Sequence, residues 1–433
     1  MACYSSLHHH VHSWWKNLGR FGGDFPFRQR VGYKRSPCRS RPCSVAFSRG
    51  FSKINTKLES DLPRVTHSSN SSAVSLQIDK HATHGNGLES LKLKDTDANL
   101  NPLEGRVILV DGTAIIYRAY YKLLSKLNHG YLEHADGNGD WVYTIFTALS
   151  NLIDILEFVP THVAVVFDHD GIPFGNSTAN SSQESYMAKG LTFRHTLYPS
   201  YKSQRVPTPD TVVQGRQYFK ASIKAMSIKV IEVPGVEADD VIGTLAAKSV
   251  AAGFKVRVAS PDKDFFQILS PSLRLLRVAP RGPQLVSFGV EDFAEKYGGL
   301  EPSQFVDLMA LMGDKSDNIP GVEGIGLVNA LKLITRFGTL ENLLNCIDQV
   351  EEERIREILK SNAEQAVLSK NLATVRCDLP FYMVPFHTSD LAFEKPMDNG
   401  DKFISLLRAI GAYAEGFSAD PIIRRAFYLW NKL

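Results

Sequence analysis

Pro234 to Asp240 reads PGVEADD and follows an apolar run from Ile228 to Val233. The run has the length of a buried strand, Pro-Gly predicts a turn, and the Val-Ile-Gly-Thr-Leu pattern that comes next predicts a helix. Three acids, Glu237, Asp239 and Asp240, therefore fall in the first helical turn. One acid there would be ordinary, because the helix dipole favours negative charge. Three crowded carboxylates repel one another unless a cation intervenes, so the stretch favours a divalent metal site.

Acids also follow three other apolar runs of the chain. The runs and their acids are 107–110 with Asp111, 163–167 with Asp168, and 255–259 with Asp262 and Asp264. Apolar runs that alternate with amphipathic helical patterns predict the α/β class, with a mainly parallel central sheet flanked by helices. A lone Asp after a strand is commonly a turn or helix-cap residue. Because the carboxyl ends of parallel strands meet at one edge, their repetition predicts a shared acidic pocket.

A glycine-rich stretch, 313–326, precedes a helical pattern at 327–334. Its acids are Asp314 and Asp317, and its glycines include Gly321, Gly324 and Gly326. Glycines before a helix let backbone N–H groups approach a phosphate, and Lys332 can supply a second contact. The stretch lacks the preceding strand and the GxGxxG spacing of a dinucleotide site. The glycine-rich stretch is therefore predicted to bind the nucleic-acid backbone beside the acidic pocket.

Composition sets outer limits on these predictions. The chain has 433 residues, 43% of them hydrophobic, and a formal net charge of +3, so any basic surface must be local. No apolar run is long enough to span a membrane, and no membrane association is expected. The five cysteines show no metal-binding spacing. A reducing compartment without structural zinc is the simpler interpretation.

The first hundred residues do not have the pattern of a fold. Residues 1–57 contain eleven Lys or Arg and one acid, Asp24, with scattered serines. This composition predicts an organellar transit peptide, for a plastid, a mitochondrion or both; a basic tail that binds nucleic acid is the alternative. Residues 58–103 are polar without apolar periodicity, which predicts a disordered linker.

From Arg106 to about Pro385 the motifs resemble, in order, the 5′-3′ exonuclease domain of bacterial DNA polymerase I, a member of the flap endonuclease family. The motifs are LVDG at 109–112 with YR at 117–118, FRHT at 193–196, YPSYKSQR at 198–205, VEADD at 236–240, PDKDF at 261–265 and GDKSDNIPGVEGIG at 313–326. With its basic leader, the chain also resembles a plant organellar 5′-3′ exonuclease.

The resemblance implies roles for particular residues. The carboxylates that fall on the family's metal ligands are Asp111, Asp168, Glu237, Asp239, Asp240, Asp262, Asp264, Asp314 and Asp317. They would hold two or more Mg²⁺ ions, for which Mn²⁺ can substitute. All of them except Asp314 and Asp317 would also be catalytic, together with Lys202. The positions implied to bind DNA are Tyr117, Arg194, Tyr201, Lys202, Arg205, Gly321, Gly324, Gly326 and Lys332.

The resemblance also implies a domain plan. A catalytic resolvase-like domain with a PIN-like fold and a helical arch is expected at 104–290. A helix-two-turn-helix subdomain, or SAM fold, is expected at 291–390, and a C-terminal helical extension that packs on the core at 391–433. The stretch from Ile172 to Leu191, rich in Asn and Ser, has no counterpart in the bacterial relatives and is expected to be a loop at the base of the arch.

The expected function is metal-dependent hydrolysis of DNA near 5′ flaps, ends or gaps, in organellar replication or repair. RNA-DNA primers are further expected substrates, and a separate organellar DNA polymerase is an expected partner. Two alternatives stay open: an inactive DNA-binding scaffold that keeps the fold, and a haloacid-dehalogenase-type phosphatase suggested by the residues DHDG at 168–171. The intact set of acids argues against a scaffold, and the phosphatase does not explain the PGVEADD stretch or the glycine loop.

Overall fold

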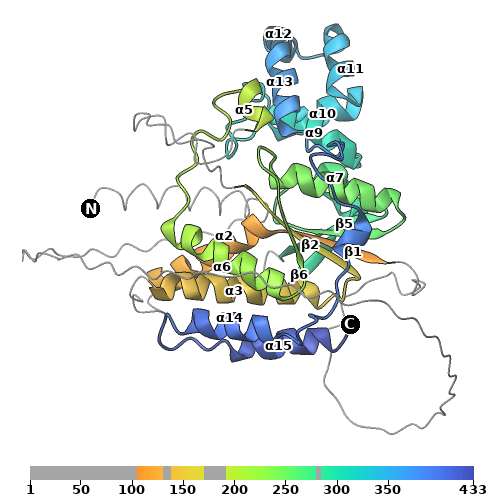
Figure 1. Cartoon of the computed structure of the whole chain (residues 1–433). Helices are drawn as coiled ribbons and strands as arrows, with labels where there is room; N and C mark the ends of the chain where they lie inside the picture. The colour runs from red at the N-terminus through yellow and green to blue at the C-terminus, as the bar shows by residue number, and fades with distance from the viewer. Residues whose placement is uncertain (1–104, 130–137, 170–191, 279–283) are drawn as a thin grey trace, which may run out of the picture. The chain divides into compact units, whose positions relative to one another are not determined.

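Residues 105–129, 138–169, 192–278 and 284–433 are described by the structure, a computed structural model of the chain (Figure 1). The predicted leader at 1–57, the linker at 58–103 and the insert at 172–191 lie outside these ranges. Within them, no helix is both long enough and apolar enough to cross a membrane.

A six-stranded sheet forms the centre of the described chain. Its strands are β1 (Arg106–Asp111), β2 (His162–Phe167), β3 (Lys229–Glu232), β4 (Lys255–Ala259), β5 (Leu273–Val278) and β6 (Leu285–Phe288), in the order β3-β2-β1-β4-β5-β6. Neighbouring strands are parallel except β5 and β6, which are antiparallel. The predicted mainly parallel sheet is confirmed, and β5 and β6 form an antiparallel hairpin at one edge of it.

The central position of β1 follows from its sequence. Val107 and Leu109 pack into the apolar core on one face of the sheet, and Ile108 and Val110 pack into the core on the other face. All four are buried. A strand that is apolar at every position can bury both of its faces, which requires helices above and below the sheet.

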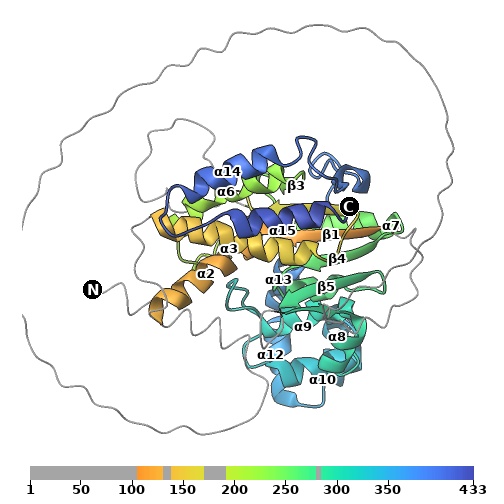
Figure 2. The same ribbon diagram turned by 90° about the horizontal axis from the view of Figure 1, so that it is seen from below.

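Helices cover both faces of the sheet (Figures 1 and 2). Helix α7 (Ala238–Ala251) covers one face, and α2 (Gly112–Asn128), α3 (Asn138–Leu156) and α6 (Asp210–Ala225) cover the other. Of the predicted arch, the described part contains one short helix, α5 (Phe193–Leu197).

A second group of helices continues the core on the α7 side. It consists of α8 (Val290–Lys296), α9 (Phe305–Met312), α10 (Leu327–Phe337), α11 (Leu340–Asn345), α12 (Glu353–Ser361) and α13 (Ala363–Ala373). We call these helices the C-terminal module. Leu308, Leu333 and Leu359 of the module share one apolar cluster with Val241 of α7, so module and sheet are packed as one body.

The C-terminal extension, expected to be helical, contains two helices, α14 (Asp401–Gly411) and α15 (Asp420–Trp430). Both lie against the helical layer of α3 and α6 (Figure 2). The Arg425 guanidinium pairs with Asp154 of α3 and with Glu157, which directly follows α3. The predicted packing of the extension on the core is therefore confirmed.

Candidate active site

Acids from three strand ends and one helix meet at the carboxyl edge of the sheet. Asp111 ends β1, and its Oδ1 accepts the Ala114 N–H at 2.8 Å, which caps α2. Asp168 follows β2, and its Oδ1 accepts the Ala238 N–H at 2.9 Å, which ties the start of α7 to the same edge. Asp239 therefore joins the strand-end acids. Asp262 and Asp264 lie just after β4, at the same edge of the sheet, and Asp262 Oδ1 accepts the Asp264 N–H at 2.9 Å.

Five of the nine predicted ligands form a set that we call the cation-free carboxylates. They are Asp111, Asp168, Asp239, Asp262 and Asp264. Among the described residues, no Lys, Arg or His nitrogen lies within 4.0 Å of their carboxylate oxygens. Burial raises the pKa of Asp111 to about 7, and the Asp168 and Asp262 charges add to this rise. Burial, then the Asp262 and Asp111 charges, also raise the pKa of Asp239 well above its usual value.

Asp264 is the acid whose surroundings best suit a bound cation. Its Oδ1 is buried and has no hydrogen-bond partner in the described part of the chain. Burial, followed by the Asp262 and Asp317 charges, raises its pKa well above the usual range. A buried carboxylate oxygen without a partner is costly, and hard divalent cations bind such oxygens. The cation-free carboxylates thus fit Mg²⁺ by donor chemistry, although the described side chains contain no group of three His, Cys, Asp or Glu already oriented around one point.

The other four predicted ligands are paired with cations, and we call them the cation-paired carboxylates: Glu237, Asp240, Asp314 and Asp317. Lys202 Nζ lies 2.7 Å from Glu237 Oε2 and 3.5 Å from Asp317 Oδ2. Arg205 also pairs with Asp317. Burial alone would raise the pKa of Glu237 and of Asp317, but these cations, with Arg194 beside Glu237, outweigh it and lower both pKa values to about 2. Asp314 pairs with Lys263 at 2.9 Å.

Asp240 is committed to protein groups rather than to the pocket. Its Oδ2 accepts Arg194 Nη1 at 2.6 Å, and its Oδ1 accepts both Arg194 Nη2 and the Arg376 N–H at 2.8 Å. The residue is 1% exposed. The prediction that Asp240 is a metal ligand is therefore corrected: both of its oxygens are already bonded to buried donors.

Two predicted DNA contacts also require correction. The Arg194 side chain is 3% exposed and fully engaged inside the protein. Tyr201 is equally buried, and its hydroxyl donates to Glu237 Oε2 at 3.2 Å. Neither side chain can reach DNA from these positions, so both belong to the interior support of the pocket.

The remaining predicted contacts near the pocket are more accessible. Lys202 has a left-handed backbone conformation, with φ of 54°, and places its ammonium between Glu237 and Asp317. Arg205 is more exposed. Tyr117 is half-buried on α2, and its hydroxyl donates to Thr208 Oγ1 at 3.0 Å. Its stacking role stays a prediction.

The glycines of the loop divide into two kinds. Gly321 is buried, has φ of 65°, and donates its N–H to Ser369 Oγ at 3.0 Å. A Cβ on Gly321 would lie 2.3 Å from the Gly313 nitrogen, so the position serves close backbone packing, and the predicted phosphate contact is corrected. Gly324 and Gly326 are exposed just before α10 and stay candidates for backbone contact.

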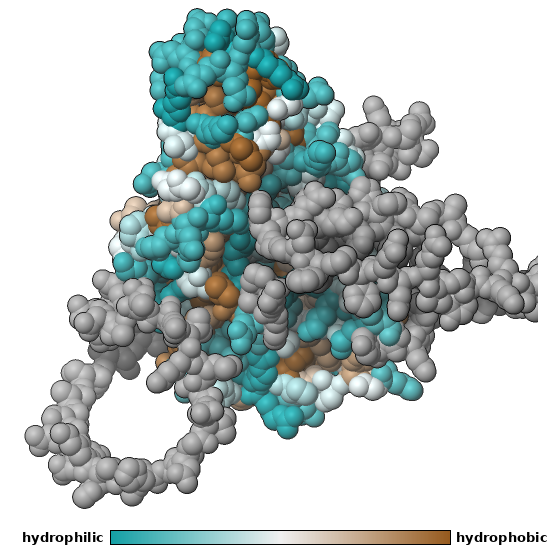
Figure 3. Space-filling model, turned by 180° about the vertical axis from the view of Figure 1, so that it is seen from behind, coloured by the Kyte–Doolittle hydropathy of each residue, from teal (hydrophilic) through white to brown (hydrophobic). Residues whose placement is uncertain are grey.

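The surface around α10 is exposed and carries both basic and acidic residues. Lys332 is 67% exposed and has only a loose contact, 3.8 Å, with Glu352. With Arg336 and Ile355 it lines a hollow of about 320 Å³. Much of the module's tip is hydrophilic, with apolar residues gathered beneath it (Figure 3). A Lys in this position can meet a phosphate without desolvating a paired charge.

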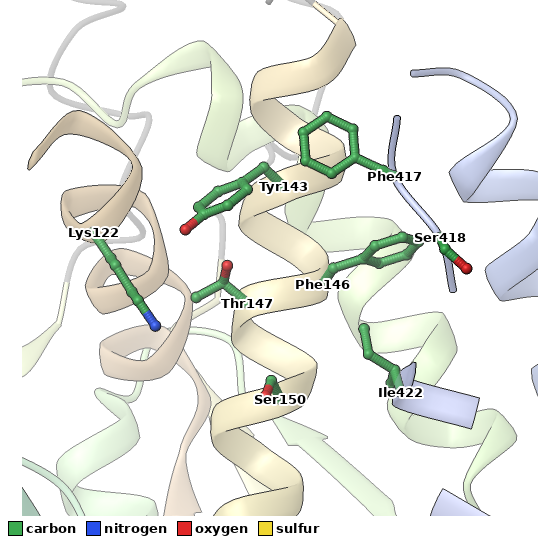
Figure 4. Close-up of a pocket in the computed structure, with 8 residues that line it drawn as sticks. All are labelled: Lys122, Tyr143, Phe146, Thr147, Ser150, Phe417, Ser418 and Ile422. Carbon is green, nitrogen blue, oxygen red and sulfur yellow. The ribbon is translucent and has the colours of Figure 1, made fainter. Parts of the chain in front are cut away.

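A separate hollow of about 260 Å³ lies between α2, α3 and the C-terminal extension (Figure 4). Lys122, Tyr143, Ser150 and Phe417 are among its lining residues. No acid lines it, so it takes no part in the acidic pocket.

Several residues of the site were not expected from the sequence. Lys263 pairs with Asp314, Thr192 Oγ1 donates to Glu237 Oε1 at 3.1 Å, and Ser260 Oγ donates to Asp111 Oδ2 at 3.0 Å. Lys263 stands between Asp262 and Asp264, and that spacing is the one local signal that could have drawn attention to it.

Comparison with known proteins places the chain in a family. Residues 106–298 match the model for the 5′-3′ exonuclease N-terminal resolvase-like domain, and residues 300–399 match the model for the 5′-3′ exonuclease C-terminal SAM fold. The chain therefore belongs to the 5′-3′ exonuclease family.

Among its relatives is DNA polymerase I of Bacillus caldotenax, 36% identical over 339 residues, which cover 76% of this chain and 35% of the relative. The thermostable DNA polymerase I of Thermus thermophilus is 37% identical over 278 residues, or 64% of this chain and 29% of the relative. The chain thus spans about a third of the length of these curated relatives.

Solved structures with a similar chain path include the T5 D15 protein co-crystallised with metal ions and the catalytic core of Rad2 in complex with DNA substrate. The first has a TM-score of 0.47 at 19% identity and covers 70% of this chain and 99% of its own. The second has a TM-score of 0.46 at 16% identity and covers 76% and 92%.

Proposed function

We propose that this chain is a divalent-metal-dependent 5′-3′ exonuclease and flap endonuclease that hydrolyses phosphodiester bonds of DNA near 5′ ends. The observation that carries the proposal is the cation-free set: five carboxylates at one sheet edge, with a buried oxygen of Asp264 that has no hydrogen-bond partner among the described residues. Burial and neighbouring acids raise the pKa of four of the five, Asp111, Asp239, Asp262 and Asp264. Membership in the 5′-3′ exonuclease family supports it.

Asp111, Asp168, Asp239, Asp262 and Asp264 would hold the ions, with Mg²⁺ as the proposed metal and Mn²⁺ as a substitute. When bound, such ions supply charge stabilisation and nucleophile activation for phosphodiester hydrolysis. The Lys202 ammonium, which is paired with Glu237 and Asp317, would stabilise negative charge on a phosphate at the pocket. Exposed Lys332, Gly324 and Gly326 would hold duplex backbone without reading sequence.

The proposed substrates are DNA with 5′ flaps, ends or gaps, including RNA-DNA primers. The proposed protein partner is a separate organellar DNA polymerase. The test is incubation of the full chain with 5′-labelled flap DNA in Mg²⁺, in Mn²⁺ and in EDTA. We expect short 5′ products with either metal and none in EDTA. A gel shift without cutting in all three conditions would instead identify a DNA-binding scaffold.

We further propose that residues 1–57 direct import into a plastid, a mitochondrion or both, because the segment is basic and nearly free of acids. A fluorescent fusion of residues 1–57 should enter an organelle, and deletion of the segment should leave cutting in vitro unchanged. Loss of DNA affinity on deletion would support the basic-tail interpretation.

A further inference from the structure

Arg194 joins three segments that are far apart in the sequence. It lies in α5, its guanidinium binds both oxygens of Asp240 in α7, and it donates to two carbonyls at the end of α13. The bond from Nε to Leu372 O measures 2.9 Å, and that from Nη2 to Thr374 O measures 2.6 Å. Short α5 lies beside α13 (Figure 1). Few of its donor positions are left for a ligand, so Arg194 acts within the protein.

The first turns of α7 are held tightly against the segment that follows α13. The Arg376 N–H donates to Asp240 Oδ1, and a Cβ on Gly243 would lie 2.7 Å from Arg376 O. The contact therefore leaves no room for a shift of α7 at this point. Asp240 directly follows Asp239, and Glu237 precedes α7 as its N-cap residue. Anything that fixes Asp240 also fixes the backbone from which these two acids project.

We propose that Arg194 and Asp240 form a positioning pair, which locks the acid-bearing turn of α7 to the end of the C-terminal module. The pair would keep Asp239 and Glu237 at a fixed position relative to the strand-end acids, without contacting metal or DNA itself. This inference rests on the proposed function and deepens it. It removes Asp240 from the candidate metal ligands, and it gives Arg194 the role of joining the start of α7 to the end of α13. Outer partners of metal ligands typically affect metal affinity or activity by about 10- to 100-fold.

The experiment uses the full chain and four variants: Arg194→Gln, Asp240→Asn, the double variant, and Arg425→Gln as a matched control. Arg425 also joins distant segments, since from α15 it binds Asp154 of α3 and Glu157 just after α3, but it lies outside the acidic pocket. The measurements are melting temperature, Mn²⁺ binding by calorimetry without DNA, the Kd for flap DNA in Ca²⁺, and the single-turnover rate as a function of Mg²⁺.

We expect each single pocket variant to raise the Mg²⁺ concentration for half-maximal rate by about tenfold, in line with loss of an outer partner, and to leave the DNA Kd within about twofold. The double variant should recover melting temperature relative to either single variant, because neither buried charge is then unpaired. It should keep the wild-type number of Mn²⁺ equivalents. Arg425→Gln should lower the melting temperature without moving the Mg²⁺ midpoint.

Two results would overturn the proposal. If the double variant melts like the wild type but loses one Mn²⁺ equivalent, Asp240 is a ligand. If the single variants behave like Arg425→Gln, with lower melting temperature and an unchanged Mg²⁺ midpoint, the pair only stabilises the fold. Absence of cutting by the wild-type chain would instead count against the proposed function, and the Mn²⁺ titration would still decide the role of the pair.

Discussion

The cation-free and cation-paired carboxylates lie at one edge of the same sheet, yet their electrostatic surroundings are opposite. Asp111, Asp239 and Asp264 have raised pKa values, because they are buried among other acids. Glu237 and Asp317 have pKa values near 2, because Lys202 and neighbouring arginines outweigh the effect of burial. The difference comes from the basic residues beside each acid: Arg194, Lys202 and Arg205 of segment 192–205 pair with Glu237, Asp240 and Asp317, and Lys263 pairs with Asp314. The acidic pocket therefore contains two kinds of carboxylate: the cation-free ones, which are candidate metal ligands, and the cation-paired ones, whose charge is already balanced by neighbouring Lys and Arg.

Substituting a cation-free acid should have the largest effect. Asp239→Asn or Asp262→Asn is expected to lower the single-turnover rate on flap DNA by about 1000-fold at low millimolar Mg²⁺, since the ions supply most of the charge stabilisation. DNA affinity in Ca²⁺ should stay close to the wild-type value, because the C-terminal module is unaltered. A variant that keeps near-wild-type turnover would remove that residue from the ligand set.

Stability without metal should change in opposite directions for the two sets. In EDTA, Asp262→Asn should raise the free energy of unfolding, because burial and neighbouring acids disfavour its charge. Asp317→Asn should lower it by about 1–2 kcal/mol, a value reduced for the partial exposure of Arg205. Urea unfolding of both variants in EDTA measures the two signs. If both substitutions changed the free energy of unfolding in the same direction, the two sets of carboxylates would not differ in their effect on stability.

Lys202 is paired with two of the cation-paired carboxylates, Glu237 and Asp317. Lys202→Ala is expected to lower the single-turnover rate by about tenfold with little change in DNA affinity, on the scale of one preorganised charged contact. Lys202 is held by Glu237 and Asp317, so its position does not depend on DNA. Rate and Kd should be measured on one flap substrate. A change in Kd alone would contradict a role for Lys202 at the scissile phosphate.

The smallest effect is expected far from the pocket. Lys332→Ala should weaken flap binding by a fewfold and reduce the salt dependence of binding by about one phosphate contact, with the rate at saturation nearly intact. Lys432→Ala serves as a control, because this lysine is also exposed but follows α15 at the end of the chain. Equal salt slopes for the two variants would exclude Lys332 from the duplex contact.

The strands and the meeting of acids at one edge could be predicted, because apolar runs and parallel pairing are properties of local sequence. The pairing of Arg194 with Asp240 could not, because the residues are 46 positions apart and meet only through tertiary packing. Gly321 shows the same limit. A glycine before a helix suggests phosphate contact, whereas the structure uses this one for close packing on Gly313. Motifs locate the pocket, and only packing shows which members face it.

Helix α2 starts at Asp111, which is its N-cap residue, and Tyr117 lies six positions further along the same helix. At a rise of about 1.5 Å per residue, the Cα atoms of Asp111 and Tyr117 are separated by about 9 Å along the helix axis. If Tyr117 stacks a base, as the family resemblance implies, helix α2 would fix the spacing between that base and the acids at the sheet edge. Inserting one residue between Asp111 and Tyr117 would turn the ring by about 100° around the axis and change that spacing, even with every acid in place.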